Sequence, residues 1–157
     1  MECLLIGGAQ SVGKSETIYL LTNNLINLGY QVVAGSYPAT FSDFRIVLEG
    51  LNRYGRNVRI IINSPTDTVD IINDFKNFFD SNGNYDIFIS SVRDGGFWPR
   101  REFFKIMNIA VPKDFILEIP LGKITRRGSN RPTAINWHQR QSLNLVNYIL
   151  TNNPFNL

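Results

Sequence analysis

Short apolar runs alternate along the chain with segments of helical periodicity. The first run, Glu2 to Ile6, is almost continuously apolar, which is typical of a strand buried on both faces of a parallel sheet. From Lys14 to Leu28 apolar residues recur every three or four positions and Gly29 follows, which predicts an amphipathic helix with a glycine just beyond its C-cap. Tyr30 to Ala34 predicts a second strand. Residues 1–35 are therefore expected to form a βαβ unit.

The stretch from Ser42 to Asn63 fits two patterns. Its first half has apolar residues at helical spacing after a possible N-cap at Ser42, whereas alternation over the whole stretch predicts a β-hairpin. The helix would bury Phe44, Val47, Leu48 and Leu51, and the hairpin would align Phe44, Ile46 and Leu48 with Val58, Ile60 and Ile62 around a turn at Asn52–Asn57. We favour the hairpin, because Gly50 inside a helix would cost about 1 kcal/mol relative to alanine and Ile46 and Val47 are β-branched.

The alternation of helices and strands resumes after this stretch. The pattern predicts, in chain order, a helix at Asp67–Phe79, a strand at Asp86–Ser90, a short helix at Arg101–Met107, a strand at Phe115–Ile119 and a closing helix at Ala134–Leu150. These elements predict an α/β fold, a three-layer sandwich in which helices cover both faces of a mostly parallel central sheet, with one antiparallel hairpin. Because the chain shows no repeat or break in composition, residues 1–157 are expected to form one domain.

Composition indicates the cellular compartment in which the protein is expected to work. Cys3 is the one cysteine, so the chain has no disulfide framework and nothing indicates an oxidising compartment. The N-terminus lacks the pattern of a signal peptide, and no apolar run approaches the roughly 18 residues that span a bilayer. We therefore expect a cytoplasmic protein with no membrane partner.

Charge is distributed unevenly over the two halves of the chain. Residues 1–85 carry 6 Lys/Arg and 8 Asp/Glu, a balance of −2, whereas residues 86–157 carry 10 and 5, a balance of +5. An excess of arginine suits an anionic ligand, either the phosphates of a small molecule or a nucleic-acid backbone. A solvated basic face is the alternative interpretation.

The most specific chemical signal follows the first predicted strand. The segment from Gly8 to Ser15 matches G-x-x-x-x-G-K-[ST] at every defined position. Gly8 and Gly13 allow successive backbone N–H groups to converge on phosphate oxygens, and the helix that starts near Lys14 directs the positive end of its dipole at the same anion. Lys14 is expected to reach the β- and γ-phosphates, and the Ser15 hydroxyl is expected to ligate Mg²⁺. The residues expected to bind nucleotide are Gly8, Ala9, Gln10, Ser11, Val12, Gly13, Lys14, Ser15 and Glu16.

This motif resembles the Walker A loop of the P-loop NTPase superfamily. The run from Gly7 to Ser15, followed by a helix and by Gly29-Tyr30-Gln31-Val32-Val33, is similar to the start of dethiobiotin synthetases and related ATPases. If the hairpin forms, the run from Ile60 to Thr66 takes the place where GTPases carry an apolar strand ending in Asp-x-x-Gly, and the match there is imperfect. The Asn-Lys-x-Asp guanine signature of GTPases is absent from the sequence. The resemblance thus implies ATP rather than GTP, with Mg²⁺, and makes Lys14 the main catalytic candidate.

A second acid that supports the Mg²⁺ ion is expected at the end of a neighbouring strand. The two candidate strands end in the neutral residues Asn63 and Ser90, and the next carboxylate after the second strand is Asp94. We therefore assign the catalytic and metal-associated acid to Asp94, with Asp67 as the second choice. The alternative is that Asp94 is a turn residue ahead of two glycines.

A basic loop lies after the last predicted strand. Arg126 and Arg127 resemble in position the lid arginines of nucleotide kinases, and Arg131 lies close by. These arginines are expected to bind the nucleotide or its acceptor, unless they belong to a solvated loop. A helix over residues 42–54 would favour a kinase, because Asp43 and Arg45 would then stand beside the substrate.

Two classes of function remain open. The first is an NTP hydrolase or a phosphotransferase with a small-molecule acceptor. The second is a nucleotide-dependent switch that acts on a protein or nucleic-acid partner with little catalysis. The first class is the leading interpretation, whereas the neutral strand ends and the basic second half support the switch as the alternative.

Overall fold

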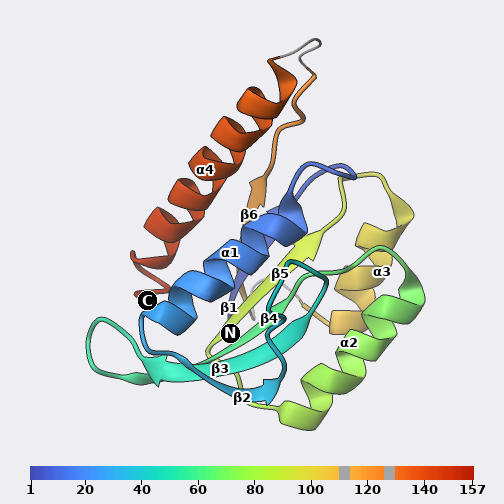
Figure 1. Cartoon of the computed structure of the whole chain (residues 1–157). Coiled ribbons are helices and arrows are strands. Elements are labelled where there is room, and N and C mark those ends of the chain that lie inside the picture. Colours follow the sequence, from blue (N-terminus) through green and yellow to red (C-terminus); the bar gives the residue numbers. More distant parts are fainter. Residues whose placement is uncertain (110–113, 126–129) are drawn as a thin grey trace.

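The computed structural model describes residues 1–109, 114–125 and 130–157. The described part of the chain contains six strands and four helices (Figure 1). In chain order they are β1 (Glu2–Gly7), α1 (Lys14–Asn27), β2 (Gln31–Gly35), β3 (Arg45–Leu51), β4 (Asn57–Asn63), α2 (Val69–Asn82), β5 (Ile87–Val92), α3 (Trp98–Met107), β6 (Phe115–Pro120) and α4 (Arg131–Leu150). Among these described helices, none is long and apolar enough to cross a membrane.

All six strands belong to one mixed sheet with the order β2-β3-β4-β5-β1-β6. β1 pairs in parallel with β5 on one side and β6 on the other, and β4 pairs in parallel with β5. β3 pairs antiparallel with both β2 and β4. The expected α/β fold with a mostly parallel sheet is confirmed in this form.

The segments of the expected βαβ unit form in the predicted order, but β1 and β2 are not neighbours. Both edges of β1 are occupied by β5 and β6, whereas β2 lies at the far edge of the sheet and pairs only with β3. Four of the five residues of β2 are exposed, and a strand that is not buried on both faces suits an edge position. Apolar content alone therefore did not distinguish an edge strand from a central one.

The β-hairpin predicted between Ser42 and Asn63 is confirmed, and the helical alternative is wrong. β3 and β4 pair in register from Arg45 opposite Asn63 to Leu51 opposite Asn57. The Asn52 side chain stabilises the turn, because its Oδ1 accepts hydrogen bonds from the backbone N–H groups of Tyr54 and Arg56, both at 3.0 Å.

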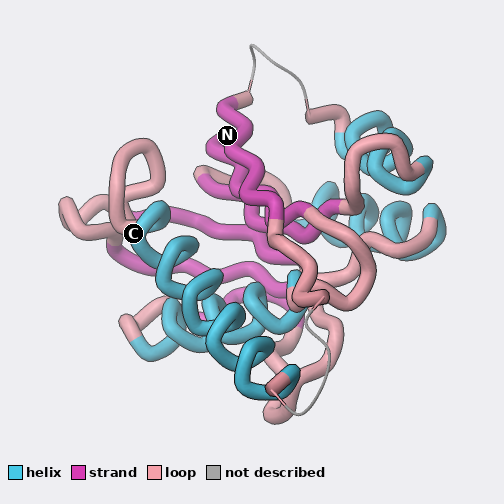
Figure 2. Tube along the Cα trace, turned by 90° about the horizontal axis from the view of Figure 1, so that it is seen from above, coloured by secondary structure: helices cyan, strands magenta, loops and turns pink. Residues whose placement is uncertain are grey.

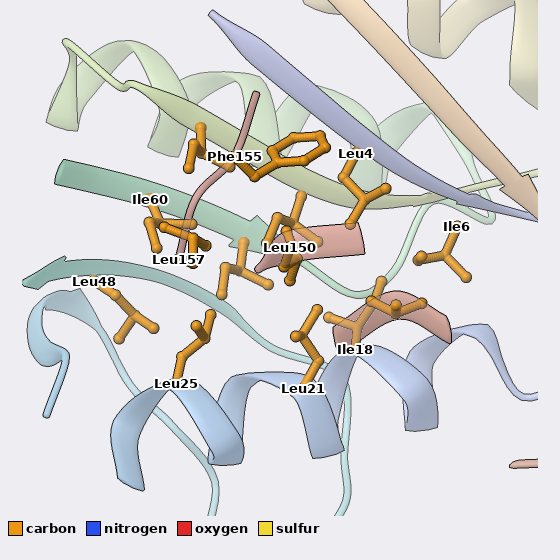
Figure 3. Packing of buried hydrophobic residues seen from close by; sticks show 14 of the residues in the cluster. Leu4, Ile6, Ile18, Leu21, Leu25, Leu48, Ile60, Leu150, Phe155 and Leu157 are labelled. Atoms are coloured by element: carbon orange, nitrogen blue, oxygen red, sulfur yellow. The ribbon is translucent and has the colours of Figure 1, made fainter. Parts of the chain in front are cut away.

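Helices cover both faces of the sheet, as the alternation along β1 requires (Figure 2). Leu4 and Ile6 belong to a buried cluster with residues of α1 and α4, while Cys3 and Leu5 belong to a second cluster with residues of α2 and α3. Figure 3 shows how the first cluster joins α1 to the sheet and to the C-terminal residues; it includes Ile18, Leu21, Leu25, Leu48, Ile60, Leu150, Phe155 and Leu157. β1 is thus buried from both sides, and the loop that follows it starts from a fixed strand.

Candidate functional site

The loop between β1 and α1 has the backbone shape that its glycines allow. Gly8, Ser11 and Gly13 have φ values of 140°, 60° and 91°, in or near the region that favours glycine. A Cβ on Gly8 would come within 2.9 Å of Val12 Cγ2 and 3.0 Å of the Leu121 carbonyl oxygen. Gly13 is the N-cap of α1, so the loop passes directly into the positive end of a helix dipole.

Lys14 turns its side chain back over this loop. Its Nζ donates hydrogen bonds to the carbonyl oxygens of Gly8 at 2.8 Å and Ala9 at 2.7 Å, and the residue is only 8% exposed. Burial and then the positive charge of Arg93 lower the pKa of Lys14 below its usual value, while Asp67 and Asp94 oppose that shift. Since its hydrogen-bond acceptors are neutral carbonyls, the ammonium group would gain from a bound anion.

Ser15 and Glu16, the next two residues, connect α1 to other elements. The Ser15 hydroxyl donates to the carbonyl oxygen of Ser64 at 3.3 Å, just beyond the end of β4. The Glu16 carboxylate accepts a hydrogen bond from the Gln139 side chain of α4. The structure therefore places the expected metal-ligating hydroxyl where the start of α1 meets the end of β4.

Neutral polar groups occupy the ends of β4 and β5. Asn63 Nδ2 donates to the Pro65 carbonyl oxygen at 2.8 Å and to Ser90 Oγ at 3.3 Å. The hydroxyl groups of Thr66 and Ser91 lie 2.9 Å apart. Because these side chains are buried and bonded to one another, they fix the chain after β4 against the end of β5.

An ion pair lies next to this network. Arg93 follows β5 directly and contacts Asp67, with 2.6 Å between Nη2 and Oδ1. Its guanidinium carbon lies 5.8 Å from the centre of the Phe97 ring, a cation–π distance. Arg93 was not among the site residues predicted from the sequence. A charged residue immediately after a continuously buried strand was the available signal, because such positions gather at the carboxyl edge of a parallel sheet.

These groups surround a cavity of about 650 Å³. Its wall is made by the segment from Gln10 to Glu16, by both members of the ion pair with the nearby Ser91, and by residues from three other parts of the chain. The wall consists of Gln10, Ser11, Val12, Gly13, Lys14, Ser15, Glu16, Phe41, Asp67, Ser91, Arg93, Gly122, Lys123, Ile124, Arg131, Ile135, His138 and Gln139. A volume of this size is typical of a small-molecule site.

Of the site residues that were predicted outside the Gly8–Ser15 loop, some line the cavity and others do not. Asp67 and Arg131 line the cavity, whereas Asp94 is an exposed loop residue that is not part of the wall. Arg126 and Arg127 lie outside the described residues. Within the described ranges, no three or more His, Cys, Asp or Glu side chains form a group that could hold a metal ion by themselves.

Comparisons with models of protein families, with curated proteins and with solved structures give no match. The chemistry of the site therefore has to be inferred from its own residues.

Proposed function

We propose that this protein binds a nucleoside triphosphate with Mg²⁺ at the loop from Gly8 to Ser15, with ATP preferred over GTP, and that it hydrolyses the nucleotide or transfers its terminal phosphoryl group. One observation carries the proposal: the Lys14 ammonium lies over a glycine-shaped loop at the N-terminus of α1 and faces a cavity large enough for a nucleotide. The position of this loop after the central parallel strand β1 supports a P-loop NTPase fold with three layers.

The chemistry that suits these groups is positioning and charge stabilisation. In hydrolysis, a water oxygen would form a bond to the γ-phosphorus while the bond from that phosphorus to the β–γ bridging oxygen breaks, which leaves the nucleoside diphosphate and phosphate. The loop N–H groups and Lys14 would stabilise the negative charge that develops on the leaving oxygen. With a small-molecule acceptor, a hydroxyl oxygen would take the place of water.

The donor set near Ser15 fits Mg²⁺. This ion usually keeps several waters and is held by one or two protein oxygens together with substrate phosphates. The Ser15 hydroxyl and the Asp67 carboxylate line the same cavity, so they would hold the ion directly or through its waters, and the ion would neutralise charge on the β- and γ-phosphate oxygens. Asp94 remains the acid favoured by sequence, although it lies outside the cavity wall.

Thermal unfolding with and without Mg-ATP tests nucleotide binding. At an ATP concentration 100 times Kd, binding to the native state should raise the free energy of unfolding by about 2.7 kcal/mol. Lys14→Met keeps the length of the buried side chain but removes its charge, so it should abolish most of this gain. Lys76→Met is the matched control, because Lys76 pairs with Asp80 on α2. A wild-type protein with no ATP-dependent shift, or an unchanged shift in Lys14→Met, would remove the proposal.

The same thermal-unfolding assay with Mg-GTP shows which of the two nucleotides, ATP or GTP, binds more tightly. Phosphate release measured alone and with candidate acceptors then separates a hydrolase from a phosphotransferase. The hairpin removes one argument for a kinase, because Asp43 and Arg45 do not lie on a helix beside the substrate.

A second candidate function, a nucleotide-dependent switch, is favoured by the contacts of Ser64. Its carbonyl oxygen accepts from Ser15, its Oγ accepts from the backbone N–H of Phe44 at 2.9 Å, and its hydroxyl donates to Asp43 at 3.2 Å. The segment between β2 and β3 is thus tied to the expected metal position, and its exposed Phe41 lines the cavity. If this protein is a switch, ATP and ADP should give different hydrogen-exchange protection at residues 36–44 while turnover stays slow.

A further inference from the structure

The buried guanidinium of Arg93 is incompletely satisfied by its surroundings. The residue is 9% exposed, and its Nε has no hydrogen-bond partner among the described residues. Its ion-pair partner Asp67 has a side chain that is 54% exposed. A buried charge without a full set of partners is costly, so this arrangement would be stabilised by a further acceptor.

The position of Arg93 limits what that acceptor can be. Arg93 lines the same cavity as Lys14 and Ser15, and its charge contributes to the lowered pKa of Lys14. Two cations that disfavour each other across one cavity would both gain from a shared anion. A guanidinium can bind phosphate oxygens through two donors at once, which strengthens and orients the contact.

We propose that Arg93 binds the γ-phosphate of a bound nucleoside triphosphate, and that its ion pair with Asp67 opens when a triphosphate enters and closes again on a diphosphate. The proposal rests on the nucleotide binding proposed above. A terminal phosphate carries more negative charge and more acceptor oxygens than one carboxylate, so it displaces Asp67 from Arg93. The released carboxylate then faces the metal position beside Ser15.

The exchange has a structural consequence at the start of α2. Asp67 immediately precedes Thr68, whose side chain caps α2 by accepting from the Ile71 backbone N–H at 3.3 Å. Movement of Asp67 away from Arg93 would therefore be transmitted to the first turn of this helix. Arg93 thus distinguishes a triphosphate from a diphosphate, and the position of Asp67 depends on which of the two is bound.

Equilibrium binding of a non-hydrolysable ATP analogue and of ADP tests the proposal on the full chain. Arg93→Gln should weaken binding of the analogue about 10- to 100-fold, the range of a lost charge-assisted contact, and should weaken ADP binding less than about threefold. Arg56→Gln is the matched control, because Arg56 forms an exposed ion pair with Asp86 on the surface. Equal effects on both nucleotides, or no effect on either, would overturn the role of Arg93.

A second variant tests the exchange and does not depend on how Arg93→Gln folds. Asp67→Asn frees Arg93, so in the absence of Mg²⁺ it should strengthen binding of the analogue several-fold without changing ADP binding. Asp70→Asn is the control, because it also removes one negative charge, from the exposed first turn of α2. It measures the effect of the lost charge alone, without the contact to Arg93. An Asp67→Asn effect no larger than that of Asp70→Asn would overturn the exchange.

The outcomes also separate this inference from the proposed function. If the wild-type protein binds neither nucleotide, both are wrong. If it binds ATP and ADP through Lys14 but Arg93→Gln and Asp67→Asn do not alter the preference between them, nucleotide binding stands and the exchange is wrong.

Discussion

The two candidate metal acids have different surroundings. The Asp67 carboxylate lines the cavity and contacts Arg93. Asp94 lies on an exposed turn, where its backbone carbonyl oxygen accepts from the Phe97 N–H at 3.3 Å. Sequence separation from a strand end placed Asp94 first, but only the paired strands show which carboxylate faces the cavity. The geometry therefore favours Asp67, the second choice from sequence.

Titration of ATP binding with Mg²⁺ checks this order. Asp67→Asn should raise the Mg²⁺ concentration needed for half-maximal binding by about tenfold, the effect of losing roughly 1.4 kcal/mol of metal interaction. Asp94→Asn should change it less than about twofold, because screened charges on an exposed turn interact weakly with the site. A larger effect in Asp94→Asn would restore the order inferred from the sequence.

The glycine-dependent shape of the Gly8–Ser15 loop could be predicted from local sequence, and the ion pair beside it could not. The features of the Gly8–Ser15 segment depend on spacing within one turn between a strand and a helix, so the sequence contains them directly. Arg93 and Asp67 follow different strands, β5 and β4, and meet because these strands pair in parallel. Their contact depends on strand order, which local periodicity does not specify.

At the scale of elements, the hairpin of β3 and β4 shows which features apolar alternation predicts and which contacts it does not. The alternation of Ile46 and Leu48 with Ile60 and Ile62 correctly predicted which side chains share a face of the sheet. From the sequence, a helix was disfavoured by the backbone cost of Gly50 and by the β-branched Ile46 and Val47. The structure adds a second reason for this glycine, because a Cβ there would approach ring atoms of the buried Tyr30 to 2.6–3.0 Å.

Gly50→Ala should therefore destabilise the protein by about 1–3 kcal/mol, as is typical of overpacking in a core. This cost exceeds the roughly 0.4–1 kcal/mol that alanine contributes by restricting the unfolded chain. Gly95→Ala is the control, because nothing lies within 4 Å of a Cβ at Gly95, and it should change stability by less than about 0.5 kcal/mol. Urea denaturation measures both, and equal free energies of unfolding would show that Tyr30 moves aside without cost.

At the scale of the whole molecule, the basic second half of the chain contributes to the cavity. Four of the described wall residues are cationic and two are acidic: Lys14, Arg93, Lys123 and Arg131 against Glu16 and Asp67. Three of the cations come from residues 86–157, so part of the charge excess in this half faces the site. A cavity of this charge attracts polyphosphate over a distance of roughly a Debye length. The lid role of Arg126 and Arg127 stays a prediction.

Cys3 offers a probe of the whole fold, since it is the only cysteine in the sequence. It is fully buried in β1 between β5 and β6, and burial is the main reason that its pKa rises from 9.0 to about 12. The folded protein therefore keeps this proton between pH 9 and 12, whereas the unfolded chain loses it. As a result, stability falls as the pH rises above 9.

Labelling of Cys3 by a thiol reagent should accordingly require opening of the central strand. In the regime where reclosing is faster than labelling, the rate depends on the population of the open form, so Mg-ATP at 100 times Kd should slow labelling about 100-fold. Lys14→Met should remove most of this protection without exposing the thiol in the absence of nucleotide. The rate should rise about tenfold per pH unit up to about pH 12, because the thiolate is the reactive form. Below pH 9 the rise comes from ionisation of the thiol in the open form, and above pH 9 it comes from the growing population of the open form as stability falls. A rate that does not change with saturating Mg-ATP would mean that Cys3 reacts without opening of the protein, or that binding at the loop does not stabilise β1.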